Sequence, residues 1–306
     1  MPFKIVFMGT PQFSVPTLDL LIKEKFNILK VYTQPPKKSK RGQKINPSPI
    51  ETFCIKNNID FKNPENLNNP EDLKNFELLS PDVVVVVAYG QIIPRAFLET
   101  AKFCFINIHA SLLPKWRGAA PIQRAIMNSD KEIGITIMKI EEKLDSGPIF
   151  TSRKINLDRN TTHGEIEKKL SLIGADLLIE CLKSIENEGL KLKDQKHTDA
   201  TYAKKIDKNE TKINWDLEAN KVLAHIHGLS PKPGAWFNYN NERFKILKAK
   251  VSPKNGKQGS VLDENLIIAC KSNSIQILEI QREGKNKQTA KEFLLGKKFI
   301  KNTSLN

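Results

Sequence analysis

The sequence has no long apolar run and few cysteines, and these absences exclude several classes of protein. Its longest uninterrupted apolar stretch, residues 83–88, has the length of a β-strand and falls far short of the roughly 20 residues that cross a bilayer. The four cysteines are widely separated and form no CxxC pair, which predicts neither a zinc site nor a disulfide framework. The N-terminal residues lead into a predicted strand without the pattern of a signal peptide. We therefore expect a cytoplasmic chain with no membrane association and no bound metal.

The first predicted strand-to-helix turn lacks the glycines of a dinucleotide-binding site. Residues 9–14 (GTPQFS) contain a single glycine where such a site carries GxGxxG. Pro11 removes a backbone donor, and Thr10 and Gln12 add bulk where a pyrophosphate must approach the backbone closely. The turn therefore argues against an enzyme that depends on NAD.

Basic residues outnumber acidic ones, most strongly toward the C-terminus. The 306 residues include 49 Lys and Arg against 34 Asp and Glu, a formal net charge of +15. The last 100 residues carry 18 basic and 10 acidic side chains, a net +8, whereas the first 206 carry a net +7. Such a field favours a polyanionic partner such as RNA, DNA or membrane headgroups through counterion release. A general enrichment in lysine and asparagine would also make a chain basic without such a partner.

The chain is long enough for two domains, and its first 188 residues follow the pattern of a doubly wound α/β domain. The five consecutive valines of residues 83–87 suit a strand that is buried on both faces of a parallel sheet. Predicted strands are residues 3–8, 28–32, 83–87, 103–109 and 134–140, and predicted helices are residues 14–25, 119–127 and 161–188. We therefore predict a Rossmann-like, mostly parallel sheet over residues 1–188.

The remaining residues have a different pattern. Residues 189–207 are polar and lack sustained periodicity, which predicts a linker. A predicted helix over residues 216–227 then precedes short alternating runs separated by turn residues, at 235–239, 244–249, 259–261, 266–269 and 274–280. This pattern is typical of a small β-barrel, so we predict a basic, OB-like domain over residues 208–306.

Three polar residues form a candidate catalytic group. Asn107 and His109 share one face of a predicted strand and lie at its carboxyl end, where open α/β sheets place their sites. An Asn amide can donate to a developing oxyanion, and a His can transfer protons near neutral pH. Asp145 follows the next predicted strand and is placed to orient the imidazole. The same spacing would also arise without catalysis, if the Asn107 side chain closed a turn by bonding to its own backbone and His109 were a hydrogen-bonded residue of the interior.

The segment that contains this group resembles a known family. Residues 107–123 (NIHASLLPKWRGAAPIQ) are similar to the formyltetrahydrofolate-dependent formyltransferases, which share an Asn, a His two positions later, an SLLP stretch and a later Asp. The resemblance is closest to members that act on methionyl-tRNA and extends over nearly the whole chain. It includes the segments at 9–13 (GTPQF), 46–49 (NPSP), 88–90 (AYG), 136–138 (TIM), 144–147 (LDSG), 203–206 (AKKI) and 293–296 (FLLG).

The resemblance implies an enzyme of translation initiation. Such an enzyme moves a formyl group from 10-formyltetrahydrofolate to the α-amine of methionyl initiator tRNA. By family analogy Asn107 and protonated His109 stabilise the oxyanion, His109 protonates the leaving folate nitrogen, and Asp145 holds the imidazole. Neither a metal nor a covalent intermediate is implied.

The resemblance also implies two binding segments. Ser111, Leu112, Leu113 and Pro114 would line the folate side of the crevice, although Leu112 and Leu113 suit an ordinary core equally well. In the family the loop at residues 35–44 engages the acceptor end of the tRNA. Here that loop carries five cations and no acid: Lys37, Lys38, Lys40, Arg41 and Lys44.

Two other functions stay open at this point. A formyltransferase that acts on a small amine, such as glycinamide ribonucleotide or an amino sugar nucleotide, would share the Asn, His and Asp. A non-catalytic RNA-binding protein would use only the basic C-terminal domain. Family members more often carry Arg at the position of His227, and a His there carries little positive charge toward RNA near neutral pH. No self-association motif is visible, and we expect a monomer.

Overall fold

The computed structural model describes residues 3–39 and 44–305 and divides the chain into two compact units. The N-terminal unit comprises Met1–Gly118, Gly134–Lys154 and Lys168–Tyr202. The C-terminal unit comprises Ala119–Ile133, Ile155–Glu167 and Ala203–Asn306. Two segments that precede residue 188 therefore pack with the C-terminal residues. The domain boundaries at residues 188 and 207 stay a prediction.

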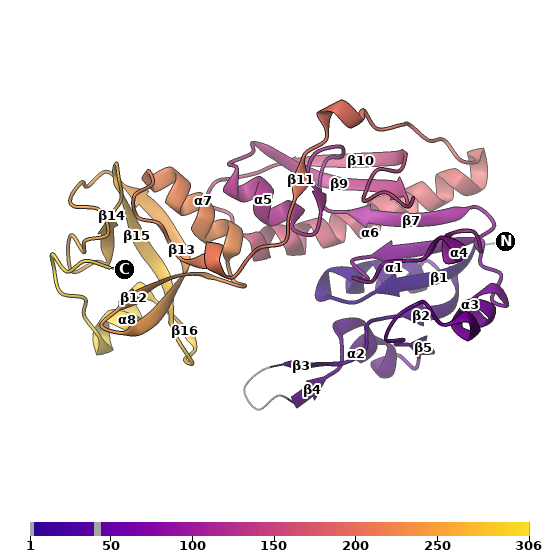
Figure 1. Cartoon of the computed structure of the whole chain (residues 1–306), viewed down its shortest axis with the longest axis horizontal. Helices are drawn as coiled ribbons and strands as arrows, with labels where there is room; N and C mark the ends of the chain where they lie inside the picture. Colours follow the sequence, from indigo (N-terminus) through magenta and orange to yellow (C-terminus); the bar gives the residue numbers. More distant parts are fainter. Residues whose placement is uncertain (1–2, 40–43, 306) are drawn as a thin grey trace. The chain divides into compact units, whose positions relative to one another are not determined.

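The N-terminal unit is built on a seven-stranded sheet in the order β10-β9-β7-β6-β1-β2-β5 (Figure 1). The pairs β1–β2, β1–β6, β6–β7 and β2–β5 are parallel, and β9 runs antiparallel to β7. The strands of this sheet are β1 (Lys4–Gly9), β2 (Asn27–Tyr32), β5 (Phe61–Lys62), β6 (Val83–Val87), β7 (Cys104–His109), β9 (Glu132–Lys139) and β10 (Ile149–Asn156). The prediction of a mostly parallel sheet is confirmed.

The apolar sequence of β6 explains its position in the interior of this sheet. All five valines of β6 are buried because its neighbours β1 and β7 pair along both edges and apolar layers cover both faces. One face of the sheet packs on an aromatic cluster that includes Tyr32, Phe76, Phe97 and Phe105. On the other face Gly174 lets a long helix approach β7, since a Cβ there would lie 2.9 Å from the Ile108 side chain.

Four of the helices, α2, α3, α4 and α8, were not predicted from the sequence, and the starts of α2 and α3 are alike. Each begins with a proline that directly follows an N-cap residue, Ser48 or Asn69, whose side chain accepts a backbone hydrogen bond. The α-helices are α1 (Val15–Lys23), α2 (Pro49–Lys56), α3 (Pro70–Glu77), α4 (Arg95–Leu98), α5 (Pro121–Met127), α6 (His163–Glu188), α7 (Ala219–Leu229) and α8 (Ala290–Gly296). The 3-10 helices are η1 (Gln12–Ser14), η2 (His197–Asp199) and η3 (Asn209–Thr211). No helix in the described residues is both long and apolar enough to cross a membrane.

Two short strand pairs lie outside the large sheet. β3 (Lys37–Ser39) pairs antiparallel with β4 (Lys44–Asn46), and β8 (Arg117–Gly118) pairs with β11 (Tyr202–Ala203). The β3–β4 pair contains the backbone of Lys37, Lys38 and Lys44. The other two predicted contact residues of that loop, Lys40 and Arg41, lie outside the described residues.

The C-terminal unit contains a curled antiparallel sheet in the order β12-β13-β15-β14, with β16 also paired to β15 (Figure 1). Its strands are β12 (Ala235–Tyr239), β13 (Glu242–Ser252), β14 (Ile267–Ala269), β15 (Ser274–Arg282) and β16 (Lys287–Thr289). An aromatic cluster of Phe237, Phe244, Phe293 and Phe299 fills its core. The predicted C-terminal barrel is confirmed as this curled, half-barrel sheet.

One buried histidine of the C-terminal unit makes stability depend on pH. Burial lowers the pKa of His163 from 6.5 to about 4, and its Nδ1 is buried without a hydrogen-bond partner among the described residues. Between pH 6.5 and 4 the unfolded chain therefore binds a proton that the folded chain rejects, so stability falls as pH falls. We expect this residue to remove about 2 kcal/mol between pH 7 and pH 5.

Urea unfolding of wild type and His163→Gln at the two pH values measures this contribution. Burial also lowers the pKa of His225 and of His227, so the variant keeps part of the pH dependence. The contribution of His163 is therefore the difference between wild type and variant in the stability lost from pH 7 to pH 5. An equal loss of stability in both proteins would contradict the assignment.

Candidate active site

The predicted strand face brings Asn107 and His109 to the carboxyl end of β7. The parallel strands β1 and β6 end on the same edge of the sheet, so the two side chains lie where an open α/β sheet places its ligands. Asn107 is half-buried and His109 is 6% exposed. The amide can therefore reach a bound molecule, while the imidazole is largely shielded from water.

Asp145 lies beside the imidazole, as the sequence predicts. Its Oδ2 lies 3.6 Å from His109 Nδ1 and accepts a hydrogen bond from the Gly118 amide at 2.7 Å. Asp145 has a φ of 47°, in the left-handed region that few residues other than Gly adopt and that Asn and Asp tolerate better than most. The carboxylate is thus held by a backbone donor on one side and faces the imidazole on the other.

The second ring nitrogen of His109 also faces a protein oxygen. His109 Nε2 lies 3.0 Å from the carbonyl oxygen of Trp116, a residue that itself has a left-handed φ of 61°. The other end of the same peptide, the Arg117 amide, donates to the Thr201 carbonyl at 2.9 Å, and the Trp116 amide donates to Thr201 Oγ1 at 2.9 Å, so Thr201 holds this turn of the chain. A protonated His109 can donate a hydrogen bond from both ring nitrogens. For Nε2 to give its proton to a substrate, it must release the Trp116 carbonyl and bind a substrate atom instead.

The SLLP loop that follows β7 is tied to β9 through one hydroxyl. Thr136 Oγ1 donates to the Ser111 carbonyl at 2.7 Å and accepts from the Leu113 amide at 3.1 Å. Ser111 is fully buried and its hydroxyl donates to the Lys115 carbonyl, so this side chain supports the loop from within. Leu113 is 9% exposed, and Leu112 and Pro114 are half-buried.

Hydroxyl groups of the first turn tie the ends of β1 and β6 together. Thr10 Oγ1 donates to the Tyr89 carbonyl at 2.7 Å, and Ser14 Oγ donates to the Val87 carbonyl at 2.6 Å. Gly9 is required here, because a Cβ would lie 2.7 Å from the Phe7 ring and 2.8 Å from Ser14 Cβ. The hydroxyls of this turn therefore hold the carboxyl edge of the sheet together.

Other candidate residues have structural partners. His227 is fully buried, with Nδ1 donating to the Arg159 carbonyl at 2.9 Å and Nε2 accepting from the Ala249 amide at 3.3 Å. It therefore packs inside the C-terminal unit. The described residues contain no group of three or more His, Cys, Asp or Glu side chains that could hold a metal ion.

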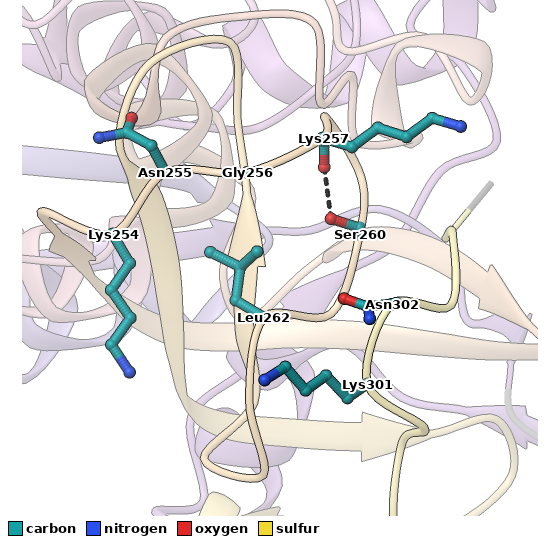
Figure 2. Close-up of a pocket in the computed structure, with 8 residues that line it drawn as sticks. All are labelled: Lys254, Asn255, Gly256, Lys257, Ser260, Leu262, Lys301 and Asn302. Atoms are coloured by element: carbon teal, nitrogen blue, oxygen red, sulfur yellow. Dashed lines mark hydrogen bonds between the residues drawn. The ribbon is translucent and has the colours of Figure 1, made fainter.

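The C-terminal unit carries a basic hollow of about 620 Å³ (Figure 2). Three lysines from two stretches of chain line it, together with polar side chains: Lys254, Lys257 and Lys301 with Asn255, Ser260 and Asn302. Lys254 pairs with Asp263, and Ser260 Oγ donates to the Lys257 carbonyl. The lining of the hollow is therefore basic and polar, with one of its lysines paired to Asp263 and its serine hydroxyl bonded within the loop.

Comparison with known proteins identifies the family. The formyl transferase family model matches residues 3–182, and the formyl transferase C-terminal domain model matches residues 205–298. The chain is 50% identical over 304 residues to the methionyl-tRNA formyltransferase of Pelagibacter ubique (strain HTCC1062), covering 99% of this chain and 98% of that protein. The chain belongs to the methionyl-tRNA formyltransferase family. The enzyme of Bradyrhizobium diazoefficiens is 43% identical, with 97% of each chain covered.

Solved structures of this and related families share the fold of the chain. The methionyl-tRNA formyltransferase from Clostridium thermocellum aligns with a TM-score of 0.56 at 19% identity, covering 83% of this chain and 95% of that one. WlaRD, a sugar 3N-formyl transferase, aligns with a TM-score of 0.67 at 21% identity, covering 94% and 100%. The predicted formyltransferase family and its fold are confirmed.

Several residues around the site of this formyltransferase were not predicted. Thr136 begins the TIM segment of the family resemblance, but we assigned it no role, because inside the apolar run of β9 its periodicity is that of a packed β-branched residue. Gln195 lies in the polar segment that we interpreted as a linker, yet it is 6% exposed and donates to the Asp145 carbonyl at 2.9 Å. A buried polar residue in such a segment has no periodic pattern to reveal it.

The Thr136 hydroxyl should be the main support of the SLLP loop. Replacement by Val keeps the shape but leaves a buried amide and a buried carbonyl without this partner, so we expect the free energy of unfolding to fall by about 2–3 kcal/mol. Thr136→Ser keeps the hydroxyl and should recover most of the loss. Urea unfolding measures both variants, and a Val variant as stable as wild type would contradict the assignment.

Proposed function

We propose that this enzyme transfers the formyl group of 10-formyltetrahydrofolate to the α-amine of methionyl initiator tRNA. The observation that carries the proposal is the cluster of Asn107, His109 and Asp145 at the carboxyl end of β7. The cluster occurs in a chain that matches methionyl-tRNA formyltransferases over almost its full length at 41–50% identity. Both domain models of the family match in order.

The chemistry needs stabilisation of an oxyanion and movement of one proton. As the amine attacks the formyl carbon, the half-buried Asn107 amide donates to the formyl oxygen, where negative charge develops. His109 donates from its protonated ring to the same oxygen or to the folate nitrogen when the carbon–nitrogen bond breaks. The nucleophilic amine loses a proton and the leaving nitrogen gains one, so the reaction needs no net proton supply.

Asp145 makes His109 suited to this task. Its carboxylate faces Nδ1 and is held by the Gly118 amide, which directs the imidazole and compensates its charge when it is protonated. Because the ring is nearly buried, these electrostatic interactions act in a medium of low dielectric constant, where they are stronger than in water.

The residues beside the cluster suit a flat, partly apolar formyl donor. Leu112 and Pro114 offer half-buried apolar atoms, and Ile92 and Leu144 in the neighbouring loops are 92% and 61% exposed. A ligand site combines apolar walls with a few placed polar groups, which these residues and the cluster would supply. Ser111 and the buried Leu113 contribute by holding the loop.

Replacement of any one member of the cluster tests this mechanism. We expect Asn107→Ala, His109→Ala and Asp145→Ala each to lower the rate constant of formyl transfer by about a hundredfold or more. Binding of folate and of tRNA should change little, since these groups act on the reacting atoms. Single-turnover kinetics with methionyl initiator tRNA measure the rate, and a near wild-type rate for His109→Ala would remove it as the proton donor.

The tRNA is proposed to bind through its phosphates. Supporting features are the cations of residues 35–44, the net +8 of the last 100 residues, and the basic hollow lined by Lys254, Lys257 and Lys301 (Figure 2). Lysine and arginine contacts to phosphate act through counterion release and carry little sequence information.

The basic loop allows a direct test of this binding mode. If Lys40 and Arg41 contact phosphates, their joint replacement by Ala should weaken tRNA binding across acceptor sequences and flatten the salt dependence by about one to two units of slope. Turnover at saturating tRNA should also fall if the loop positions the amine. Binding measured over a salt series, together with turnover, decides the point. An unchanged salt dependence together with unchanged turnover would show that these two cations are solvated and do not contact the tRNA.

A further inference from the structure

A buried pair, Arg117 and Gln195, lies directly behind the Asp145 loop in the N-terminal unit. Gln195 is 6% exposed, and its Nε2 donates to the carbonyl oxygens of Asp145 at 2.9 Å and Gly147 at 2.7 Å. Its Oε1 accepts from Arg117 Nε at 3.2 Å and from Nη2 at 2.7 Å. The side-chain amide therefore has one possible orientation, with its nitrogen toward two carbonyls and its oxygen toward a guanidinium.

Arg117 belongs to the strand β8, whose flanking backbone groups touch the catalytic cluster. The residue before it accepts from His109 Nε2 through its carbonyl, and the residue after it, Gly118, donates to Asp145 Oδ2. Arg117 itself is 4% exposed, and Nη2 also contacts His197 Nδ1 at 3.0 Å. The Arg117 side chain thus links two groups that hold Asp145. One is the Arg117–Gly118 peptide, whose amide binds the carboxylate, and the other is the Gln195 side chain, which binds the Asp145 carbonyl.

These contacts form a closed ring of hydrogen bonds around Asp145. The ring runs from Asp145 Oδ2 to the Gly118 amide, through Arg117 to Gln195, and back to the Asp145 carbonyl. Asp145 has a left-handed φ of 47°, a conformation that persists when surrounding contacts over-determine it. With its backbone and its carboxylate both held, Asp145 has little freedom to turn away from His109.

We infer that Arg117 and Gln195 are positioning residues that set the direction of the Asp145 carboxylate toward His109. The inference rests on the proposed function, because it assigns their effect to the rate of formyl transfer. The guanidinium uses two nitrogens on one oxygen and a third contact on His197, a geometry that the single ammonium of lysine does not reproduce. The Gln195 amide carries no charge, so the pair orients a loop without forming an ion pair.

The test is a double-mutant cycle on the full-length enzyme. Gln195→Met keeps the length of the side chain and removes both carbonyl contacts and the acceptor for Arg117. We expect kcat to fall by about 10- to 30-fold while KM for each substrate stays within about twofold, because the loss concerns the reacting groups. In an Asp145→Asn background the same change should lower the single-turnover rate by less than about threefold, since its effect acts through Asp145.

Two further variants separate positioning from stability. Arg117→Lys keeps the charge and the aliphatic stem, and should show the same fall in kcat and the same dependence on Asp145 even if Gln195→Met does not fold. Leu182→Ala removes a fully buried side chain of α6 in the same unit and should lower the melting temperature without changing kcat well below it.

The outcomes are distinct. Wild-type kcat in Gln195→Met or Arg117→Lys, or an equal loss with and without Asp145→Asn, would overturn the inference. Absence of formyl transfer by the wild-type enzyme would instead overturn the proposed function.

Discussion

The carboxylate of Asp145 accepts a hydrogen bond from the Gly118 amide at 2.7 Å and lies 3.6 Å from His109 Nδ1. An imidazole at the end of a strand is free to rotate about two bonds, and its use as an acid depends on a partner that selects one orientation. The loop of Asp145 and the residues at β8 supply the groups that hold the ring in one orientation. Left-handed backbone at Asp145 and at Trp116 brings a carboxylate and a carbonyl to opposite nitrogens of the same ring.

The parallel sheet supplies the other half of the arrangement. Because β1, β6 and β7 run in one direction, their carboxyl ends lie on one edge, and hydroxyls of the first turn join β1 to β6 there. Thr136 of β9 then fixes the loop that leaves β7. Burial of the strands on both faces leaves this edge as the place where polar side chains of the sheet meet bound molecules.

Strand periodicity and the order of the strands were sufficient to predict that Asn107 and His109 lie at the carboxyl end of β7 and that Asp145 lies beside the imidazole. Their catalytic roles stay a prediction. The sequence was not sufficient for Gln195, whose role depends on a contact between segments 50 residues apart along the chain. The role of Thr136 was not predicted for a different reason: a β-branched residue in an apolar strand is expected to pack in the core, and its hydroxyl gives no separate signal. The helices α2 and α3 carry N-cap and proline signals at Ser48-Pro49 and Asn69-Pro70 that do predict helix starts.

The acceptor is the central claim, since solved sugar formyltransferases such as WlaRD share the fold at 21% identity. The most direct measurement compares kcat/KM for formyl transfer from 10-formyltetrahydrofolate to methionyl initiator tRNA and to a dTDP-linked amino sugar, with the same enzyme preparation. We expect the tRNA to be preferred by a factor of about 10³ or more, because the basic surfaces contribute binding energy only to a polyanion. Equal values, or a preference for the amino sugar, would contradict this claim.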